Sequence, residues 1–152
     1  MRRLLPILLF VIAAPAFGQA REVPYWATLR AAKVYMRVGP SGAFPIAWVY
    51  RRPGLPVKVL RVMQGWRLVE DPDGERGWIF YSLLDADQGA IVVGDGLAEL
   101  RDAPAAGGKV LWRAEPGVVG ALGDCEAGWC KLDVGGREGW VRAARLWGAG
   151  EP

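Results

Sequence analysis

The stretch "GWRLVEDPDGERGWIF", residues 65–80, decides how the rest of the sequence is interpreted. It contains two short runs of β-branched and aromatic residues, and each run includes a Gly-Trp pair. A polar segment separates the runs and has Asp73-Gly74 near its centre. Short apolar runs on either side of an Asp-Gly turn are typical of a β-hairpin. The stretch therefore predicts two antiparallel strands joined by a tight turn.

A second copy of this stretch follows about one small domain later. "GWCKL" begins at Gly128, and "GREGWV" begins at Gly136. Landmarks outside the stretch repeat with the same spacing of 62 to 64 residues: Arg37 and Arg101, Gly54 and Gly117, Trp66 and Trp129, Trp78 and Trp140. Four landmarks in one order at one spacing indicate a tandem duplication.

Both copies have the pattern of β-strands rather than helices. "PVKVLRV", residues 56–62, alternates apolar and polar side chains, and Gly135-Gly136 takes the place of Asp73-Gly74 in the second copy. After residue 20, no segment keeps an apolar period of 3.6 residues. Many short strands with Gly and Pro turns predict an all-β protein made of small barrels or sandwiches.

The order of these motifs resembles that of bacterial SH3-like (SH3b) domains. An alternating "VYMRVGP" at residues 34–40 leads to a Pro-Gly, the paired Gly-Trp motifs and a hydrophobic exit. The second copy departs from this pattern, because "ELRDAP" lacks the glycine of the first motif. The resemblance implies two tandem SH3-like small β-barrels, over residues 21–87 and 88–152, after a cleaved signal peptide at residues 1–20. It also implies a binding module, since such domains often accompany cell-wall peptidases.

The first 20 residues have the three parts of a secretory signal peptide. Arg2 and Arg3 precede an apolar core at Leu4–Ala14, and small residues follow it. We expect cleavage after Ala20, with Ala16-Phe17-Gly18 as the second choice. The core is shorter than the roughly 20 apolar residues of a membrane span, although an uncleaved anchor is the alternative. The prediction is a periplasmic or secreted protein without stable membrane insertion after cleavage.

The charge of the chain changes when this segment is set aside. The whole sequence has 19 basic and 16 acidic side chains, a formal charge of +3, and a pI near 9.1. Without Arg2 and Arg3, 17 basic side chains remain against 16 acidic ones, or +1. This balance argues against a nucleic-acid partner. The two copies differ, with +3 over residues 21–87 and −2 over residues 88–152.

The tryptophans of the repeated motif are predicted to be structural. A domain of about 60 residues has a small core and needs large side chains to fill it. Equivalent positions in both copies favour this role over ligand binding. The predicted core tryptophans are Trp66, Trp78, Trp129 and Trp140.

Other aromatic residues of the first copy lie beside arginines and are predicted to bind a ligand. In "VYMRV", Val34, Met36 and Val38 share one face, so Tyr35 and Arg37 share the other. Aromatic rings interleaved with arginine suit stacking on sugars or peptides. The alternative is packing at a barrel mouth or between the two copies. The predicted ligand-binding residues are Tyr35, Arg37, Trp48, Tyr50, Arg51 and Arg52.

The sequence lacks the residues of common catalytic and metal sites. It contains no histidine, which removes Ser-His-Asp and Cys-His nucleophiles and His-containing zinc sites. Glu70 and Asp71 are expected at a solvated strand end rather than in a pair of catalytic carboxylates. We therefore predict no catalytic residues, no metal, no cofactor and no enzymatic activity.

The two cysteines, Cys125 and Cys130, lie on either side of a predicted turn at Glu126-Ala127-Gly128. Two thiolates alone make a poor metal site, and an exported protein meets an oxidising compartment. Facing positions of a hairpin can have disulfide geometry. We predict a structural disulfide, with a redox-active pair as the alternative.

Together these patterns predict a non-enzymatic periplasmic binding module. Its expected partner is a component of the cell envelope, either peptidoglycan or its stem peptide. The alternative function is a protein-interaction adaptor or an inhibitor of an envelope protein. A small hydrolase is a third hypothesis, and no set of catalytic residues supports it.

Overall fold

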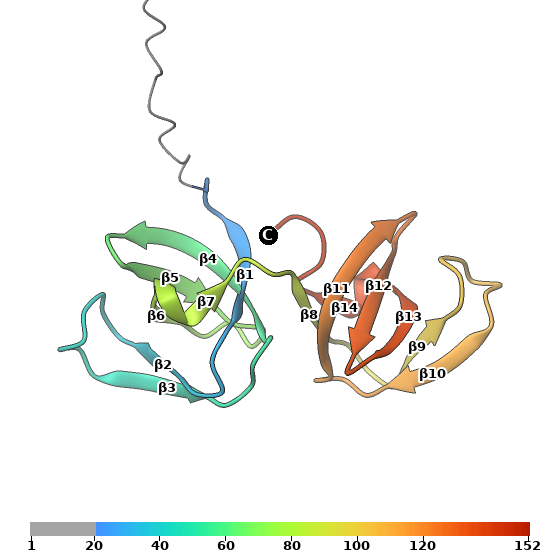
Figure 1. Cartoon of the computed structure of the whole chain (residues 1–152), viewed down its shortest axis with the longest axis horizontal. Helices are drawn as coiled ribbons and strands as arrows, with labels where there is room; N and C mark the ends of the chain where they lie inside the picture. Colours follow the sequence, from blue (N-terminus) through green and yellow to red (C-terminus); the bar gives the residue numbers. More distant parts are fainter. Residues whose placement is uncertain (1–20) are drawn as a thin grey trace, which may run out of the picture.

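The computed structural model describes residues 21–152, so the predicted signal peptide and its cleavage site lie outside the described residues. The described chain forms two curled β-sheets that lie side by side, one from each half of the sequence (Figure 1). The fold class predicted from the sequence is confirmed, since the protein is all-β and consists of two tandem SH3-like units.

The two sheets have the same strand order. The first sheet is ordered β3-β2-β6-β5-β4-β1-β7, and the second is ordered β10-β9-β13-β12-β11-β8-β14. Within residues 21–152 the edge strands of each sheet do not pair with each other, so neither barrel closes. The strands of the first sheet are β1 (Tyr25–Leu29), β2 (Val34–Arg37), β3 (Ile46–Tyr50), β4 (Pro56–Met63), β5 (Trp66–Glu70), β6 (Arg76–Phe80) and β7 (Leu84–Asp85). Those of the second are β8 (Gly89–Val92), β9 (Ala98–Arg101), β10 (Val110–Ala114), β11 (Val119–Glu126), β12 (Trp129–Val134), β13 (Arg137–Arg142) and β14 (Leu146–Trp147). A single 3₁₀ turn precedes the last strand of each sheet, at Tyr81–Leu83 and Ala143–Arg145.

The hairpin predicted from residues 65–80 is confirmed. Strands β5 and β6 pair from Trp66 with Phe80 to Glu70 with Arg76, and Gly74 lies in the turn with a φ of 86°. Asp71 corrects the expectation of a solvated strand end, because it is only 5% exposed. Its carboxylate accepts hydrogen bonds from the backbone N–H groups of Asp73 and Glu75 and so holds the turn.

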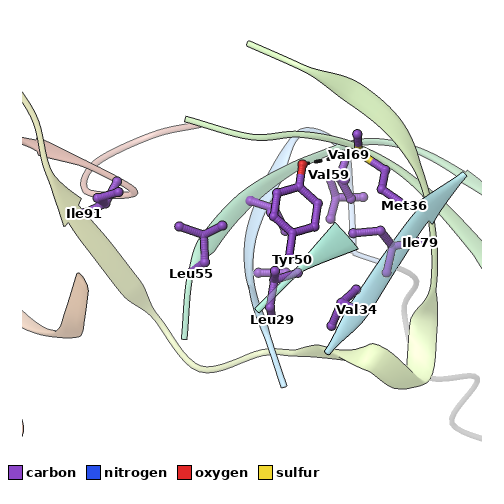
Figure 2. Close-up of a cluster of buried hydrophobic side chains, with 11 residues drawn as sticks. Leu29, Val34, Met36, Tyr50, Leu55, Val59, Val69, Ile79 and Ile91 are labelled. Carbon is purple, nitrogen blue, oxygen red and sulfur yellow. Dashed lines mark hydrogen bonds between the residues drawn. The ribbon is translucent and has the colours of Figure 1, made fainter. Parts of the chain in front are cut away.

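The main core of the first sheet is built from aliphatic side chains and one tyrosine, shown in Figure 2. Val34 and Met36 point into it as predicted, but Val38 is 58% exposed because β2 ends at Arg37. The buried residues of this cluster are Ala27, Leu29, Val34, Met36, Tyr50, Leu55, Val57, Val59, Val69, Ile79 and Ile91. The second sheet has a similar cluster of nine residues around Leu100, Leu132 and Val141.

The repeated tryptophans lie outside both of these clusters. Trp78 and Trp129 are buried as predicted, at 8% and 6% exposure, whereas Trp66 and Trp140 are only half-buried. Ile79 occupies the core, so its neighbour Trp78 points to the opposite face of the same strand. The predicted core role is therefore wrong, because the alternation of the strands turns all four rings away from the core clusters. Trp78 and Trp129 are covered on that outer side, whereas Trp66 and Trp140 remain partly exposed.

The glycines that precede Trp78 and Trp140 have a packing reason. A Cβ atom at Gly77 would lie 2.5 Å from the Cγ atom of Met36 and 2.9 Å from the carbonyl oxygen of Arg37. A Cβ atom at Gly139 would lie 2.7 Å from the Cβ atom of Leu100. Glycine at both positions lets β6 approach β2, and β13 approach β9, closely enough to pair.

The two domains pack against each other where β1 and β8 lie near each other (Figure 1), and we call this contact between the domains the waist. Ile91 of β8 belongs to the core of the first domain, so this core extends past residue 87. The rings of Trp26 and Trp147 meet edge to face, with centroids 4.6 Å apart. The indole N–H of Trp26 also donates to the carbonyl oxygen of Gly150 at 2.9 Å.

The cysteines form the predicted disulfide between facing positions of β11 and β12. Glu126 pairs with Trp129, so the turn consists of Ala127 and Gly128 alone, with φ values of 50° and 80°. The disulfide therefore staples a tight hairpin and leaves no free cysteine in the chain.

Candidate functional site

The six predicted ligand-binding residues are not brought together in one place. Tyr35 is the cross-strand partner of Val49, whereas Met36 is the partner of Trp48. Since paired residues of adjacent strands share a face, Tyr35 and Trp48 lie on opposite faces of the β2–β3 hairpin. The structure therefore separates the six residues into an outer face, an inner face and a contact with the second domain.

Tyr50 is a core residue and not a surface residue, which corrects its assignment to the ligand surface. It is 6% exposed, and its hydroxyl donates to the Oδ2 atom of Asp71 at 2.8 Å. Figure 2 shows its ring among the core side chains, with the hydroxyl directed to the sulfur of Met36. Burial and this hydrogen bond raise the pKa of Tyr50 well above its ordinary value. The residue fastens the end of β3 to the turn after β5, and a ligand does not reach it.

Trp48 lies on the same face as Tyr50 but beyond the rim of the core. It is 55% exposed, with its ring centroid 6.5 Å from that of Tyr50. Phe44 and Ile46 are also more than two-fifths exposed. Ile46 pairs with Arg37 across a register shift, so it lies on the other side of the hairpin from Trp48. We call Phe44, Ile46 and Trp48, three exposed apolar side chains of β3 and the loop before it, the apolar ridge of the first domain.

Arg52 points toward the second domain. Its guanidinium donates to the carbonyl oxygen of Gly117 at 2.6 Å. The alternative considered from the sequence, packing between the two copies, therefore describes Arg52. This arginine belongs to the waist rather than to a ligand surface.

The remaining predicted residues, Tyr35, Arg37 and Arg51, form a basic cluster on the outer face with Lys33. The ammonium of Lys33 lies 4.9 Å from the centre of the Tyr35 ring. A hydrogen bond with Lys33 lowers the pKa of the Tyr35 phenol, and the charges of Arg51 and Arg37 act in the same direction. Arg37 is held in place by donating to the carbonyl oxygen of Phe44 at 2.7 Å.

A row of aromatic rings continues this outer face. Arg37 pairs with Trp78, and Phe80 pairs with Trp66, so these side chains point to the same side as Tyr35. The ring centroids of Trp66 and Phe80 are 5.4 Å apart, and Phe80 is 38% exposed. We call Lys33, Tyr35, Arg37, Arg51, Trp66 and Phe80 the aromatic-basic face. Sequence reasoning missed Phe80. The strand alternation could have shown it, because Phe80 follows the apolar Ile79 and so points to the opposite face of β6.

A cleft of about 470 Å³ lies between the two domains. Arg30 and Asp85 form an ion pair at 3.3 Å in its wall, and Thr28 donates to the carbonyl oxygen of Asp87. Asp87 and Asp133 add further carboxylates, while much of the remaining lining is glycine backbone. This cleft is acidic, so it does not suit a ligand that carries carboxylates.

The aromatic-basic face offers aromatic rings and positively charged side chains. Within residues 21–152 no group of three or more His, Cys, Asp or Glu side chains is arranged to hold a metal ion. The same part of the chain has no helix of sufficient length and apolarity to cross a membrane. Stacking and ion pairing on the aromatic-basic face are the interactions that this geometry provides.

Comparison with known families agrees with the two-domain architecture. The profile of the bacterial SH3 domain family matches residues 30–86 and again residues 94–148. The chain belongs to this family. No curated protein gives a significant match to this bacterial SH3 domain protein.

Two solved structures, of NlpC1 and NlpC2 from Trichomonas vaginalis, are similar to the chain. The first is 15% identical and covers 85% of this chain and 47% of that chain, with a TM-score of 0.37. The second is 13% identical and covers 84% of this chain and 49% of that chain, also with a TM-score of 0.37. The chain thus spans about half the length of each of these structures.

Proposed function

We propose that the protein is a non-enzymatic binding module that recognises peptidoglycan through the aromatic-basic face of its first domain. The observation that carries this proposal is that edge-to-face aromatic rings and arginine side chains share the outer face of one sheet. Membership of the bacterial SH3 domain family supports a cell-wall ligand. A fold does not by itself define a ligand, so the proposal depends on this surface chemistry.

Peptidoglycan presents both kinds of group that this face can bind. Its sugar rings have apolar C–H faces that stack on aromatic side chains, here Trp66 and Phe80. Its stem peptides carry carboxylates, which guanidinium groups bind with two parallel hydrogen bonds. Arg37 and Arg51 lie beside Tyr35 and supply these groups.

The predicted signal peptide at residues 1–20 supports a location outside the cytoplasm. In the periplasm or after secretion the protein would meet the cell wall directly. The sequence has no histidine to serve as a general base, which supports binding without turnover.

A protein-interaction function is the second candidate, and the apolar ridge favours it. Phe44, Ile46 and Trp48 are 43%, 44% and 55% exposed, although they are large and apolar. Such side chains are enriched in protein interfaces. An adaptor or inhibitor that binds an envelope protein would use this ridge rather than the aromatic-basic face.

Sedimentation with purified insoluble cell walls separates the two candidates. We expect the described chain, residues 21–152, to sediment with cell walls, and a Tyr35→Ala, Arg51→Gln variant to bind about 10-fold more weakly. A Trp48→Ala, Arg30→Gln variant loses one aromatic ring and one positive charge elsewhere and serves as the matched control. Binding should weaken with added salt. Equal losses in both variants, or no binding of the parent chain, would contradict the proposal.

A further inference from the structure

The second domain contains a groove that the function proposed above does not use. Its volume is about 480 Å³, and it lies along β9, β10, β12 and β13. Residues 88–152 carry seven basic side chains against nine acidic ones, yet four of the seven are arginines of this groove. The groove is lined by Leu97, Glu99, Arg101, Arg113, Trp129, Val141, Arg142 and Arg145.

This groove occupies the place that the aromatic-basic face has in the first domain. Arg37 pairs with Trp78, and Arg101 pairs with Trp140, so the two sheets can be compared position by position. Phe80, which pairs with Trp66, corresponds to Arg142, which pairs with Trp129. In the same way Tyr35 and Val49 correspond to Glu99 and Arg113. Where the first copy has aromatic and apolar side chains, the second has charged ones.

Two of the four arginines are committed to the fold of the second domain. Arg101 donates to the carbonyl oxygens of Ala106 and Gly108. Arg145 donates to the carbonyl oxygens of Val93 and Gly96, each at 2.7 Å. These arginines contribute positive charge to the groove, but their positions are fixed by backbone contacts.

Glu99 already places one carboxylate in the groove. It forms ion pairs with Arg101 and with Arg113, the latter at 3.1 Å. Its pKa is lowered by the hydrogen bond from Arg113 and then by the charge of Arg101, so the group is ionised at neutral pH. The groove therefore binds a carboxylate of its own chain, which shows the chemistry that it accepts.

Arg142 differs from these arginines. Its guanidinium lies 4.7 Å from the centre of the Trp129 ring, and within residues 21–152 it makes no hydrogen bond or ion pair. Stacking on the indole holds the planar group in place while its N–H edges stay open. Arg142 is thus a preorganised donor for an external carboxylate.

We propose that this groove is a second binding site of the protein and that it takes a carboxylate of the peptidoglycan stem peptide. Arg142 donates to the ligand, Arg113 joins it when the ligand competes with Glu99, and Arg101 and Arg145 supply the surrounding positive charge. This assignment rests on the proposed function, because that function supplies the occupant. Four positive charges against one negative charge in the groove match a peptide with more than one carboxylate.

The position of the groove adds a reason for two sites. Strands β2 and β3 lie at one end of the molecule, and β9 and β10 lie at the other (Figure 1). The waist holds the two ends at a fixed separation. A long polymer with repeated peptides could contact both sites at once, and such bivalent binding exceeds the affinity of either site alone.

The test uses the free stem tetrapeptide, without sugar, and residues 21–152 of the protein labelled with ¹⁵N. We expect the tetrapeptide to shift the indole N–H signal of Trp129. Arg142→Gln should weaken this binding about 10-fold. Arg137→Gln is the matched control, because Arg137 lies on the same strand and stacks on Trp112, also at 4.7 Å, outside the groove. Glu99→Gln should strengthen binding, since it frees Arg113.

Several outcomes would overturn the inference. They are an unchanged Trp129 signal, equal weakening by Arg142→Gln and Arg137→Gln, or equal binding of a tetrapeptide whose carboxylates are amidated. Cell-wall sedimentation of the same proteins distinguishes this failure from failure of the proposed function. If the chain sediments with cell walls through Tyr35 but the tetrapeptide leaves the Trp129 signal unchanged, only the second site is refuted. If the tetrapeptide shifts the Trp129 signal but the chain does not sediment with cell walls, peptidoglycan is refuted as the source of the peptide that the groove binds.

Discussion

At the scale of single residues, the hydrogen bond between Tyr50 and Asp71 shows how one pair can fix two segments. The Asp71 carboxylate accepts from the Tyr50 hydroxyl with one oxygen and from two backbone N–H groups with the other. Both residues are at most 6% exposed, so an unsatisfied oxygen here would be costly. The second domain has Ala114 at the position of Tyr50, so this fastening belongs to the first domain alone.

Tyr50→Phe should therefore destabilise the protein. The variant leaves one Asp71 oxygen without its partner, which costs about 1–3 kcal/mol in the free energy of unfolding. Urea denaturation at neutral pH measures this loss. Tyr35→Phe is the control, and its effect should stay within about 0.5 kcal/mol because Tyr35 lies on the surface. Equal effects of the two variants would contradict the role given to Tyr50.

The same pair makes stability depend on pH. Burial and Asp71 raise the pKa of Tyr50 above its ordinary value of 10.0, so the folded state favours the neutral phenol. This contribution is fully present below about pH 10 and is lost as the pH rises further. The free energy of unfolding should fall more steeply with rising alkaline pH in the parent protein than in Tyr50→Phe. Parallel pH profiles would contradict this expectation.

At the scale of strands and hairpins, the repeated Gly-Trp motif has two separate functions. The glycine allows two strands to approach closely, and the tryptophan covers the outer face of the sheet. Sequence reasoning located the motif and its turns because Gly and Asp-Gly have strong local preferences. It placed the motif tryptophans on the wrong side of the sheet, since a two-residue alternation fixes opposite faces without saying which one faces the core.

Gly77→Ala and Gly139→Ala should each destabilise the domain that contains the change. The added methyl groups would lie 2.5 Å from Met36 and 2.7 Å from Leu100, so the strands must move apart. Overpacking of this kind costs about 1–3 kcal/mol, which urea denaturation can measure. Gly42→Ala is the control, because no atom lies within 4 Å of its added Cβ. A loss as large in Gly42→Ala would show that strand spacing is not the cause.

The candidate sites show the same limit of sequence reasoning at the level of elements. Tyr35, Arg37 and Arg51 were found because they are close in sequence and surround one hairpin. The arginine groove was not found, because its residues come from four strands, a 3₁₀ turn and a loop, and the net charge of the second half is negative. Net charge averages over the surface and does not show where like charges gather.

At the scale of the whole molecule, the contacts of the waist couple the two domains. Ile91 enters the first core from β8, and Trp147 of β14 packs against Trp26 of β1. The duplication predicted two units from the spacing of the motifs, but it did not predict this docking. Contacts between copies use residues outside the repeated motif, such as Trp26 and Gly150.

Trp147→Ala should uncouple the two domains. The change removes an edge-to-face pair worth about 0.5–1.5 kcal/mol, together with the burial of the ring. Calorimetry should show one unfolding transition for the parent protein and two for the variant. Trp48→Ala, which removes a ring that is 55% exposed, should leave a single transition. A single unchanged transition in Trp147→Ala would show that other contacts couple the domains.

The contact between Trp26 and Trp147 also has an optical consequence. Two indole rings with centroids 4.6 Å apart and planes at 75° couple their electronic transitions. Coupled indoles give a paired band of opposite signs in circular dichroism, and the band vanishes when the rings separate. The protein therefore carries its own spectroscopic reporter of domain docking, and opening of the waist can be followed in solution without an added dye.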